Sequence, residues 1–220
     1  MIHSSEVPRA EAVEIGALRL PGLLTVPPDA GGVVLFAHGS GSSRLSCRNQ
    51  AVAAALVRAG FATLLFDLLS DEEAADRACV FDIPLLASRL SAAAAWVARQ
   101  PRTAGLPLGY FGASTGAAAA LVAAVTPPTP AAVVSRGGRP DLAGAALAHV
   151  TAPTLLIVGG EDTEVLELNR AAASRLGAPH RVVVVPGATH LFEEPGALDQ
   201  VAQVAADWFG RYLPAGAIRP

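Results

Sequence analysis

The chain has 220 residues, with 16 basic and 19 acidic side chains, a formal net charge of −3 and a pI near 5.9. It lacks the basic runs that nucleic-acid binding requires, so we expect no nucleic-acid partner. Mean hydropathy is +0.43, but no stretch approaches the roughly 20 consecutive apolar residues of a membrane span, and the first residues lack the apolar core of a secretory signal. We expect a cytoplasmic protein with no membrane partner.

Cysteine and lysine usage narrows the chemistry further. Cys47 and Cys79 fit neither a disulfide framework nor a metal-binding motif, so we expect free thiols and no metal site. The chain contains no Lys, which excludes a lysine-based phosphate loop, a Schiff base and a Ser–Lys dyad. We expect no cofactor. A chain of this length is large enough to form one domain over residues 1–220.

The pattern of apolar residues predicts strands that alternate with helices. An N-terminal β-hairpin is expected from residues 13–19 and 23–26, with Pro21-Gly22 as its turn. The elements that follow, in chain order, are a strand at 33–37, a helix at 48–59, a strand at 62–66, a helix at 83–99, a strand at 107–111, a helix at 115–125, a strand at 131–135, a short helix at 142–148, a strand at 154–158, a helix at 164–175, a strand at 181–185 and a helix at 196–212.

The expected strands are continuous runs of Val, Leu and Ile rather than alternating ones. Such runs indicate a mostly parallel sheet that helices cover on both faces, so the predicted fold class is α/β with a doubly wound sheet. The acidic segment 67–82 is short, and no other gap between elements has room for an independent helical cover. We therefore expect no large lid.

The most informative stretch is Gly112-Ala-Ser-Thr-Gly116, which joins a predicted strand to a predicted helix. A serine on so sharp a turn adopts strained backbone geometry, with its hydroxyl exposed above the sheet. The positions two residues before and after it must be almost free of side chain, and both are Gly. The stretch predicts that Ser114 is a nucleophile. The pattern alone also occurs in glycine-rich turns with a solvated serine.

A nucleophilic serine needs an imidazole to take its proton and a carboxylate to orient that imidazole. His190 follows the strand at 181–185 and is the predicted base. Asp162 is the preferred acid because it follows the Gly-Gly turn after the preceding strand. The neighbouring Glu161 and Glu164 are open alternatives, and so is Asp141, which follows an earlier strand.

Attack on a carbonyl creates an oxyanion, which backbone N–H groups stabilise. We expect one donor from Thr115, the residue after the nucleophile, and a second from Ser40 in the loop after the strand at 33–37. Gly39 in the same loop is expected to contact the substrate. His38 begins this loop, and we expect it to brace the loop through hydrogen bonds rather than to transfer protons.

Two arginines lie near the mouth of the predicted site. The guanidinium of Arg44 or Arg136 matches the geometry of a substrate carboxylate. The ordinary alternative, which we favour, is that both pair with nearby acids such as Glu193, Glu194 or Asp141, or face water.

The serine turn, the acid loop and the histidine loop together resemble the α/β-hydrolase superfamily over nearly the full chain. More narrowly, residues 38–44, 135–142 and 187–196 are similar to small hydrolases of the dienelactone-hydrolase-like type. That resemblance implies an α/β-hydrolase fold with a catalytic triad. Dienelactone hydrolases themselves are associated with a cysteine nucleophile, whereas this chain has Ser114 at that place. The serine indicates general carboxyl-ester hydrolysis.

These observations predict a serine hydrolase that acts on small short-chain esters through an acyl-enzyme on Ser114. Two alternatives stay open. One is another acyl-transfer enzyme, such as an amidase, a peptidase or an acyltransferase, because a triad does not encode the leaving group. The other is a ligand-binding protein that has the fold without the activity. The sequence does not determine the oligomeric state.

Overall fold

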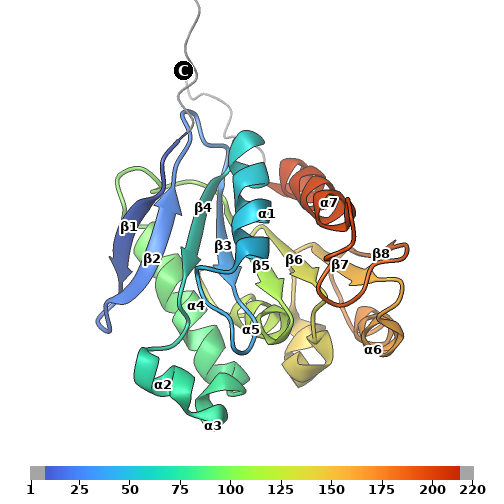
Figure 1. Ribbon diagram of the computed structural model, residues 1–220. Helices are drawn as coiled ribbons and strands as arrows, with labels where there is room; N and C mark the ends of the chain where they lie inside the picture. The colour runs from blue at the N-terminus through green and yellow to red at the C-terminus, as the bar shows by residue number, and fades with distance from the viewer. Residues whose placement is uncertain (1–7, 214–220) are drawn as a thin grey trace, which may run out of the picture.

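The computed structural model describes residues 8–213, which form an eight-stranded sheet with helices on both faces (Figure 1). The strands lie in the order β1-β2-β4-β3-β5-β6-β7-β8. Their bounds are β1 Glu11–Ile15, β2 Leu20–Thr25, β3 Val33–Ala37, β4 Ala62–Phe66, β5 Leu108–Ala113, β6 Ala132–Arg136, β7 Thr154–Gly159 and β8 His180–Val185. β2 pairs antiparallel with β1 and β4, and all pairs from β4 to β8 are parallel. The predicted α/β class is confirmed.

Two helical layers cover the sheet. The helices are α1 Cys47–Arg58, α2 Asp71–Ala75, α3 Arg77–Val80, α4 Ile83–Val97, α5 Thr115–Ala123, α6 Thr163–Ala173 and α7 Ala197–Tyr212, with a 3₁₀ helix, η1, at Pro140–His149. α1 and α7 pack on one face, and α4, α5, η1 and α6 pack on the other. Within residues 8–213, none of the helices combines the length and the apolar character that crossing a bilayer requires.

The N-terminal hairpin is present, but its turn is not where the sequence pattern placed it. The chain reverses over residues 16–19, where Gly16 and Arg19 adopt φ values of 67° and 51° and the Arg19 N–H donates to the Gly16 carbonyl at 3.2 Å. Pro21 lies in β2, and its carbonyl accepts the Asp67 N–H at 3.0 Å. Pro21-Gly22 resembles a turn in sequence, but the pairing of β2 with β4 keeps it extended.

The acidic segment 67–82 contains two short helices, α2 and α3, which the apolar pattern does not predict. Ser70 and Glu73 form a reciprocal capping box at the start of α2. The Arg89 guanidinium donates to Glu73 at 2.6 Å and so ties α2 to α4. With five and four residues, these helices form a small cover over one end of the sheet and not a large lid.

Two glycines allow α5 to start directly against the sheet. A Cβ on Gly116 would overlap the carbonyl oxygens of Ala37 and His38, and a Cβ on Gly112 would lie 2.7 Å from the Ala117 nitrogen. Real Cβ atoms do not approach other atoms so closely. The serine turn therefore depends on both positions lacking a side chain, as the sequence predicts.

We predict that Gly116→Ala lowers the free energy of unfolding by about 2 kcal/mol or more, because the new methyl group overpacks a contact between two backbone segments. Gly210→Ala is the matched control. Gly210 lies in α7, and a Cβ at this position would have no other atom within 4 Å, so alanine there is expected to stabilise the helix by roughly 0.5–1 kcal/mol. Urea unfolding of both variants measures the difference. Equal stability of Gly116→Ala and the parent would contradict this account of the turn.

Candidate active site

Ser114 lies at the turn between β5 and α5 in strained backbone geometry. Its φ is 51° and its ψ is −123°, a region that residues with a side chain rarely occupy. Hydrogen bonds hold the turn, since the Ser114 N–H donates to the Arg136 carbonyl at 3.3 Å and the Ser114 carbonyl accepts the Arg139 N–H at 3.1 Å. The side chain is half-buried and does not cap α5. The hydroxyl is therefore available for other chemistry.

His190 and Asp162 form a close pair at the same edge of the sheet. The distance between His190 Nδ1 and Asp162 Oδ2 is 2.6 Å. The Asp162 side chain is 15% exposed and that of His190 is 40% exposed. An ionised carboxylate only accepts hydrogen bonds, so the proton of the neutral imidazole lies on Nδ1. Nε2 is then left with a free lone pair, as a general base requires.

The loops after β7 and β8 bring this pair together. The Gly160 N–H donates to the Val185 carbonyl at 2.9 Å, which ties the turn after β7 to the end of β8. A Cβ on Gly159 would lie 2.6 Å from the Thr189 carbonyl oxygen. Because Gly159 has no side chain, the backbone just before His190 approaches the end of β7, where Asp162 begins α6.

The other acids that the sequence left open lie elsewhere. Asp141 accepts two hydrogen bonds from Arg139, at 2.9 and 2.7 Å. Arg139 accordingly lowers the pKa of the Asp141 carboxyl. Glu161 and Glu164 flank Asp162 in the chain, but the hydrogen bond to His190 comes from Asp162.

Contacts around His190 that the sequence did not indicate hold its loop in place. The Thr189 hydroxyl donates to Glu194 at 2.6 Å, and this bond lowers the pKa of the Glu194 carboxyl. Glu193 pairs with Arg48 of α1 at 2.9 Å. Phe192 is almost fully buried and adopts a φ of 56°. Its bulk anchors the loop against the face of the sheet that α1 and α7 cover.

The two residues expected to supply oxyanion donors touch each other. The Ser40 N–H donates to the Thr115 hydroxyl oxygen at 2.9 Å. Thr115 is the first residue of α5, where a backbone N–H has no acceptor within the helix. The hydroxyl of Thr115, which no sequence motif marks, therefore links the loop after β3 to the serine turn. Gly39 lies between them, and a Cβ there would be 3.0 Å from Ser114 Cβ.

His38 braces the loop in the way the sequence suggested. Its Nδ1 lies 3.0 Å from the Gly39 carbonyl oxygen, and its Nε2 accepts the Leu68 N–H at 3.0 Å. Since a carbonyl only accepts, the proton is on Nδ1 and both ring nitrogens are satisfied by the neutral imidazole. Burial lowers the pKa of His38 below its usual 6.5. The ring thus connects the loop after β3 to the chain that enters α2.

The two arginines near the mouth of the site are held by protein partners, as the favoured alternative expects, but not by the acids that it named, because Glu193 pairs with Arg48 and Asp141 with Arg139. The backbone N–H of Arg44 donates to Asp67 at 2.7 Å, and its guanidinium forms an ion pair with the same carboxylate. Arg136 is only 7% exposed and donates to the Asn49 side-chain oxygen at 3.3 Å. Burial, with Arg48 nearby, lowers the pKa of Arg136 to about 10. Neither guanidinium is free to bind a substrate carboxylate.

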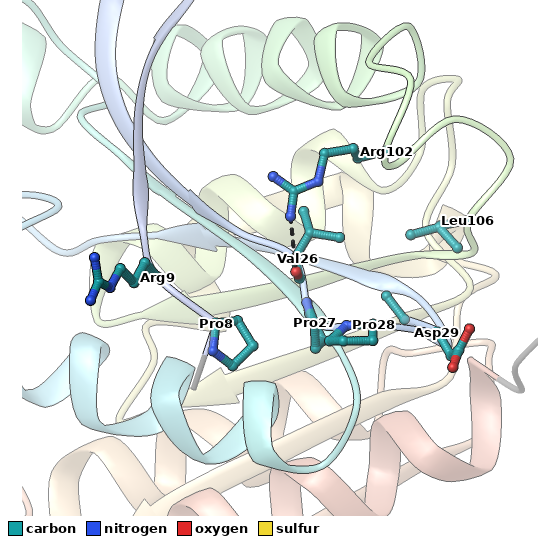
Figure 2. A pocket seen from close by; sticks show the side chains of 9 residues that line it. Pro8, Arg9, Val26, Pro27, Pro28, Asp29, Arg102 and Leu106 are labelled. Carbon is teal, nitrogen blue, oxygen red and sulfur yellow. Dashed lines mark hydrogen bonds between the residues drawn. The ribbon is translucent and has the colours of Figure 1, made fainter. Parts of the chain in front are cut away.

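Two hollows differ in their relation to Ser114. The one next to the serine turn has a volume of about 270 Å³ and is lined by residues 38–43. A larger one of about 770 Å³ lies among Pro8, Val26 and Arg102, where Arg102 donates to the Val26 carbonyl at 3.0 Å (Figure 2). It lies at the amino ends of β3 and β5, roughly 20 Å of strand away from Ser114. The smaller hollow belongs to the candidate site because residues 38–43, which line it, form the loop expected to supply the Ser40 oxyanion donor.

Within residues 8–213, no three His, Cys, Asp or Glu side chains lie close enough together to hold a metal ion. The expectation of a site that works without a metal or a cofactor stays a prediction. Cys47 and Cys79 are both free thiols in the structure, as expected.

Comparisons with known proteins agree with this fold. The model of the dienelactone hydrolase family matches residues 20–213. A dienelactone hydrolase structure from Anabaena variabilis is 55% identical, with a TM-score of 0.90 over 94% of this chain and 99% of that one. Est1E from Butyrivibrio proteoclasticus has a TM-score of 0.77 at 15% identity, over 93% of this chain and 99% of its own, and so shares the fold.

The chain spans about half the length of one curated relative that it matches. A Mycobacterium tuberculosis protein of strain H37Rv is 62% identical over 208 residues, which make up 93% of this chain and 47% of that protein. That protein is provisionally named a phosphoribosyl transferase. An uncharacterised protein of the same strain is 32% identical, over 86% of this chain and 72% of its own length.

The contacts of His38 predict a stability that depends on pH. Burial disfavours the charged ring in the folded state, so the unfolded state binds the proton more readily near pH 6.5. The contribution of His38 to the free energy of unfolding is therefore fully present above that pH. It falls as the pH drops below it, by up to about 1.4 kcal/mol per pH unit for one proton. Urea unfolding between pH 7.5 and 5 measures this slope.

His38→Asn is expected to be less stable at pH 7.5 but to show a shallower slope between pH 6.5 and 5. His149→Asn, at an exposed position of η1, controls for the loss of an imidazole as such. An unchanged slope in His38→Asn would show that another group causes the acid sensitivity.

Proposed function

The chain belongs to the dienelactone hydrolase family, and from this premise we propose that it is a serine carboxylesterase that acts on short-chain esters. The observation that carries the proposal is the 2.6 Å contact between His190 Nδ1 and Asp162 Oδ2, at the edge of the sheet where the strained turn exposes Ser114. This arrangement has the parts that activate a serine hydroxyl.

The proposed reaction proceeds through two acyl transfers. Ser114 Oγ attacks the ester carbonyl while His190 Nε2 takes the hydroxyl proton, and Asp162 stabilises the imidazolium. The N–H groups of Thr115 and Ser40 stabilise the oxyanion, and the Ser40 N–H must turn from the Thr115 hydroxyl or share its bond to do so. The alcohol leaves with the proton from His190. Water, activated by the same imidazole, then releases the acid from Ser114.

The short-chain preference is supported by the small size of the hollow beside Ser114, about 270 Å³, and of the two helices that cover it. Drug-sized ligands occupy pockets of roughly 300–1,000 Å³. Only a small acyl group is enclosed in this hollow. Each further methylene that stays in water forgoes about 0.8 kcal/mol of binding.

Other acyl transfers would use the same residues, so an amidase or an acyltransferase is the second candidate. The phosphoribosyl transferase name of the longer relative applies to a protein of which this chain covers 47%. No contact among residues 8–213 specifically favours transfer of a phosphoribosyl group, whereas the Ser114 turn and the Asp162–His190 pair favour acyl chemistry.

We predict that a fluorophosphonate probe labels the protein at Ser114, since the probe reacts with activated serines only. Ser114→Ala is expected to abolish labelling and to lower kcat for an activated ester such as 4-nitrophenyl acetate by at least about a thousandfold. Asp162→Asn is expected to cause a loss of similar size because the imidazole tautomer is no longer fixed. Mass spectrometry of the labelled peptide and steady-state kinetics give the measurements.

Ser88→Ala is the matched control, because Ser88 is an exposed serine of α4 that does not line the hollow. It should be labelled and should turn over the ester like the parent. Near-normal kcat in folded Ser114→Ala would overturn the esterase assignment. Labelling with no ester turnover, together with amide hydrolysis or acyl transfer to an amine, would favour the second candidate.

A further inference from the structure

The hollow next to the serine turn lies between the loop after β3 and the cover formed by α2 and α3. One wall is the loop 38–43, and the other contains the apolar side chains Leu69, Ala74, Val80 and Leu86 together with Asp67 and Asp71. Gly39 connects the hollow to the nucleophile, since a Cβ at this position would lie 3.7 Å from Ser114 Oγ. A group bonded to Ser114 can therefore extend into this hollow.

The topology indicates which part of an ester the hollow receives. The leaving oxygen must lie next to His190, because it takes its proton from that imidazole. His190 follows β8, so it lies beyond β6 and β7 from Ser114, whereas the hollow lies over the ends of β3 and β4 (Figure 1). The hollow and His190 are thus on opposite sides of Ser114. The acyl group, which points away from the leaving oxygen, faces the hollow.

The cover over this hollow is fixed by several polar contacts. The capping box of Ser70 and Glu73 defines the start of α2, and Arg89 holds Glu73 at 2.6 Å. The Leu68 N–H donates to His38 Nε2 at 3.0 Å, which joins the cover to the opposite wall. Because of these contacts the hollow is a preformed pocket. Substitution of one charged lining residue is therefore expected to alter substrate selectivity without changing the backbone around the hollow.

The charges around the hollow are negative. The segment 67–82 carries six carboxylates and one guanidinium. Asp67 is neutralised by Arg44, and Glu73 is neutralised by Arg89. Asp71 lines the hollow and has no ion pair within residues 8–213. Arg44 and Arg136 are held elsewhere, and Arg77, the one guanidinium of the segment, lies over the Phe81 ring at 5.5 Å and does not line the hollow.

We propose that this hollow is the acyl pocket, and that Asp71 makes it select short uncharged acyl groups and disfavour acyl groups that carry a carboxylate. The inference rests on the proposed esterase function and names its substrate class. A carboxylate at the far end of a four-carbon acyl group would approach the exposed carboxylate of Asp71, and two like charges repel.

The test compares two ethyl esters whose acyl groups have the same shape. Ethyl 4-methylpentanoate ends in an isopropyl group, and monoethyl succinate ends in a carboxylate that is ionised at pH 8. The expected kcat/KM is at least about tenfold higher for the uncharged ester at low salt. In Asp71→Asn this ratio should fall at least about threefold. In the parent it should also fall in 1 M salt, which screens the exposed carboxylate.

Glu72→Gln is the matched control, because it removes the same charge one residue further along α2 from a side chain that does not line the hollow. Its ratio should stay near that of the parent. A second pair places the charge on the alcohol side, 3-methylbutyl acetate against the acetate ester of 3-hydroxypropanoate. Asp71→Asn should change this ratio much less. An equal or larger change would assign the hollow to the alcohol and overturn the proposal.

A binding measurement separates failure of this inference from failure of the esterase function. In Ser114→Ala protein, NMR titration should show that 4-methylpentanamide binds more tightly than succinamate, and Asp71→Asn should reduce that difference. This readout needs no turnover. Absence of ester hydrolysis with this binding order would refute only the esterase function. The pocket assignment would be refuted if the parent hydrolysed esters with the same kcat/KM ratio as Asp71→Asn. It would also be refuted if Ser114→Ala protein bound succinamate as tightly as the neutral amide.

Discussion

The site depends on how closely backbone segments approach one another at the carboxyl ends of the parallel strands. Gly112 and Gly116 let α5 start against β5 and β3, and Gly159 lets the loop before His190 reach the end of β7. The first two positions hold Ser114 in its strained turn, and the third brings His190 within 2.6 Å of Asp162. Glycine loses more conformational entropy on folding than any other residue. Fully buried strands such as β3, β6 and β7 supply the apolar burial that offsets this cost.

The fold was largely predictable because strands that are buried on both faces leave continuous apolar runs in the sequence. The expected strand at 33–37 coincides with β3, and that at 62–66 with β4. Local turn signals were less informative. Pro21-Gly22 reads as a turn, but β4 pairs with this segment and keeps it in a strand. The helices α2 and α3 are too short for an apolar period, and what defines them is capping by Ser70 and Asp76.

The residue types of the site and their order along the chain were predictable, but their side-chain partners were not. Arg44 pairs with Asp67 across 23 residues, Ser40 with Thr115 across 75, and Arg136 with Asn49 across 87. No local pattern encodes such contacts, because they form only when separate strands bring their ends to one edge of the sheet. A position near the mouth of a site therefore says little about whether an arginine is free to bind a substrate.

Arg136 shows how a buried charge can serve the site without meeting a substrate. A buried guanidinium without a carboxylate partner is costly, and its compensation here is the Asn49 oxygen and the face of the Phe192 ring, 5.9 Å away. These contacts tie the end of β6 to α1 and to the loop that carries His190. The positive charge thus helps to position the loop that carries His190, whereas the carboxylate of Asp71 lines the hollow on the other side of Ser114.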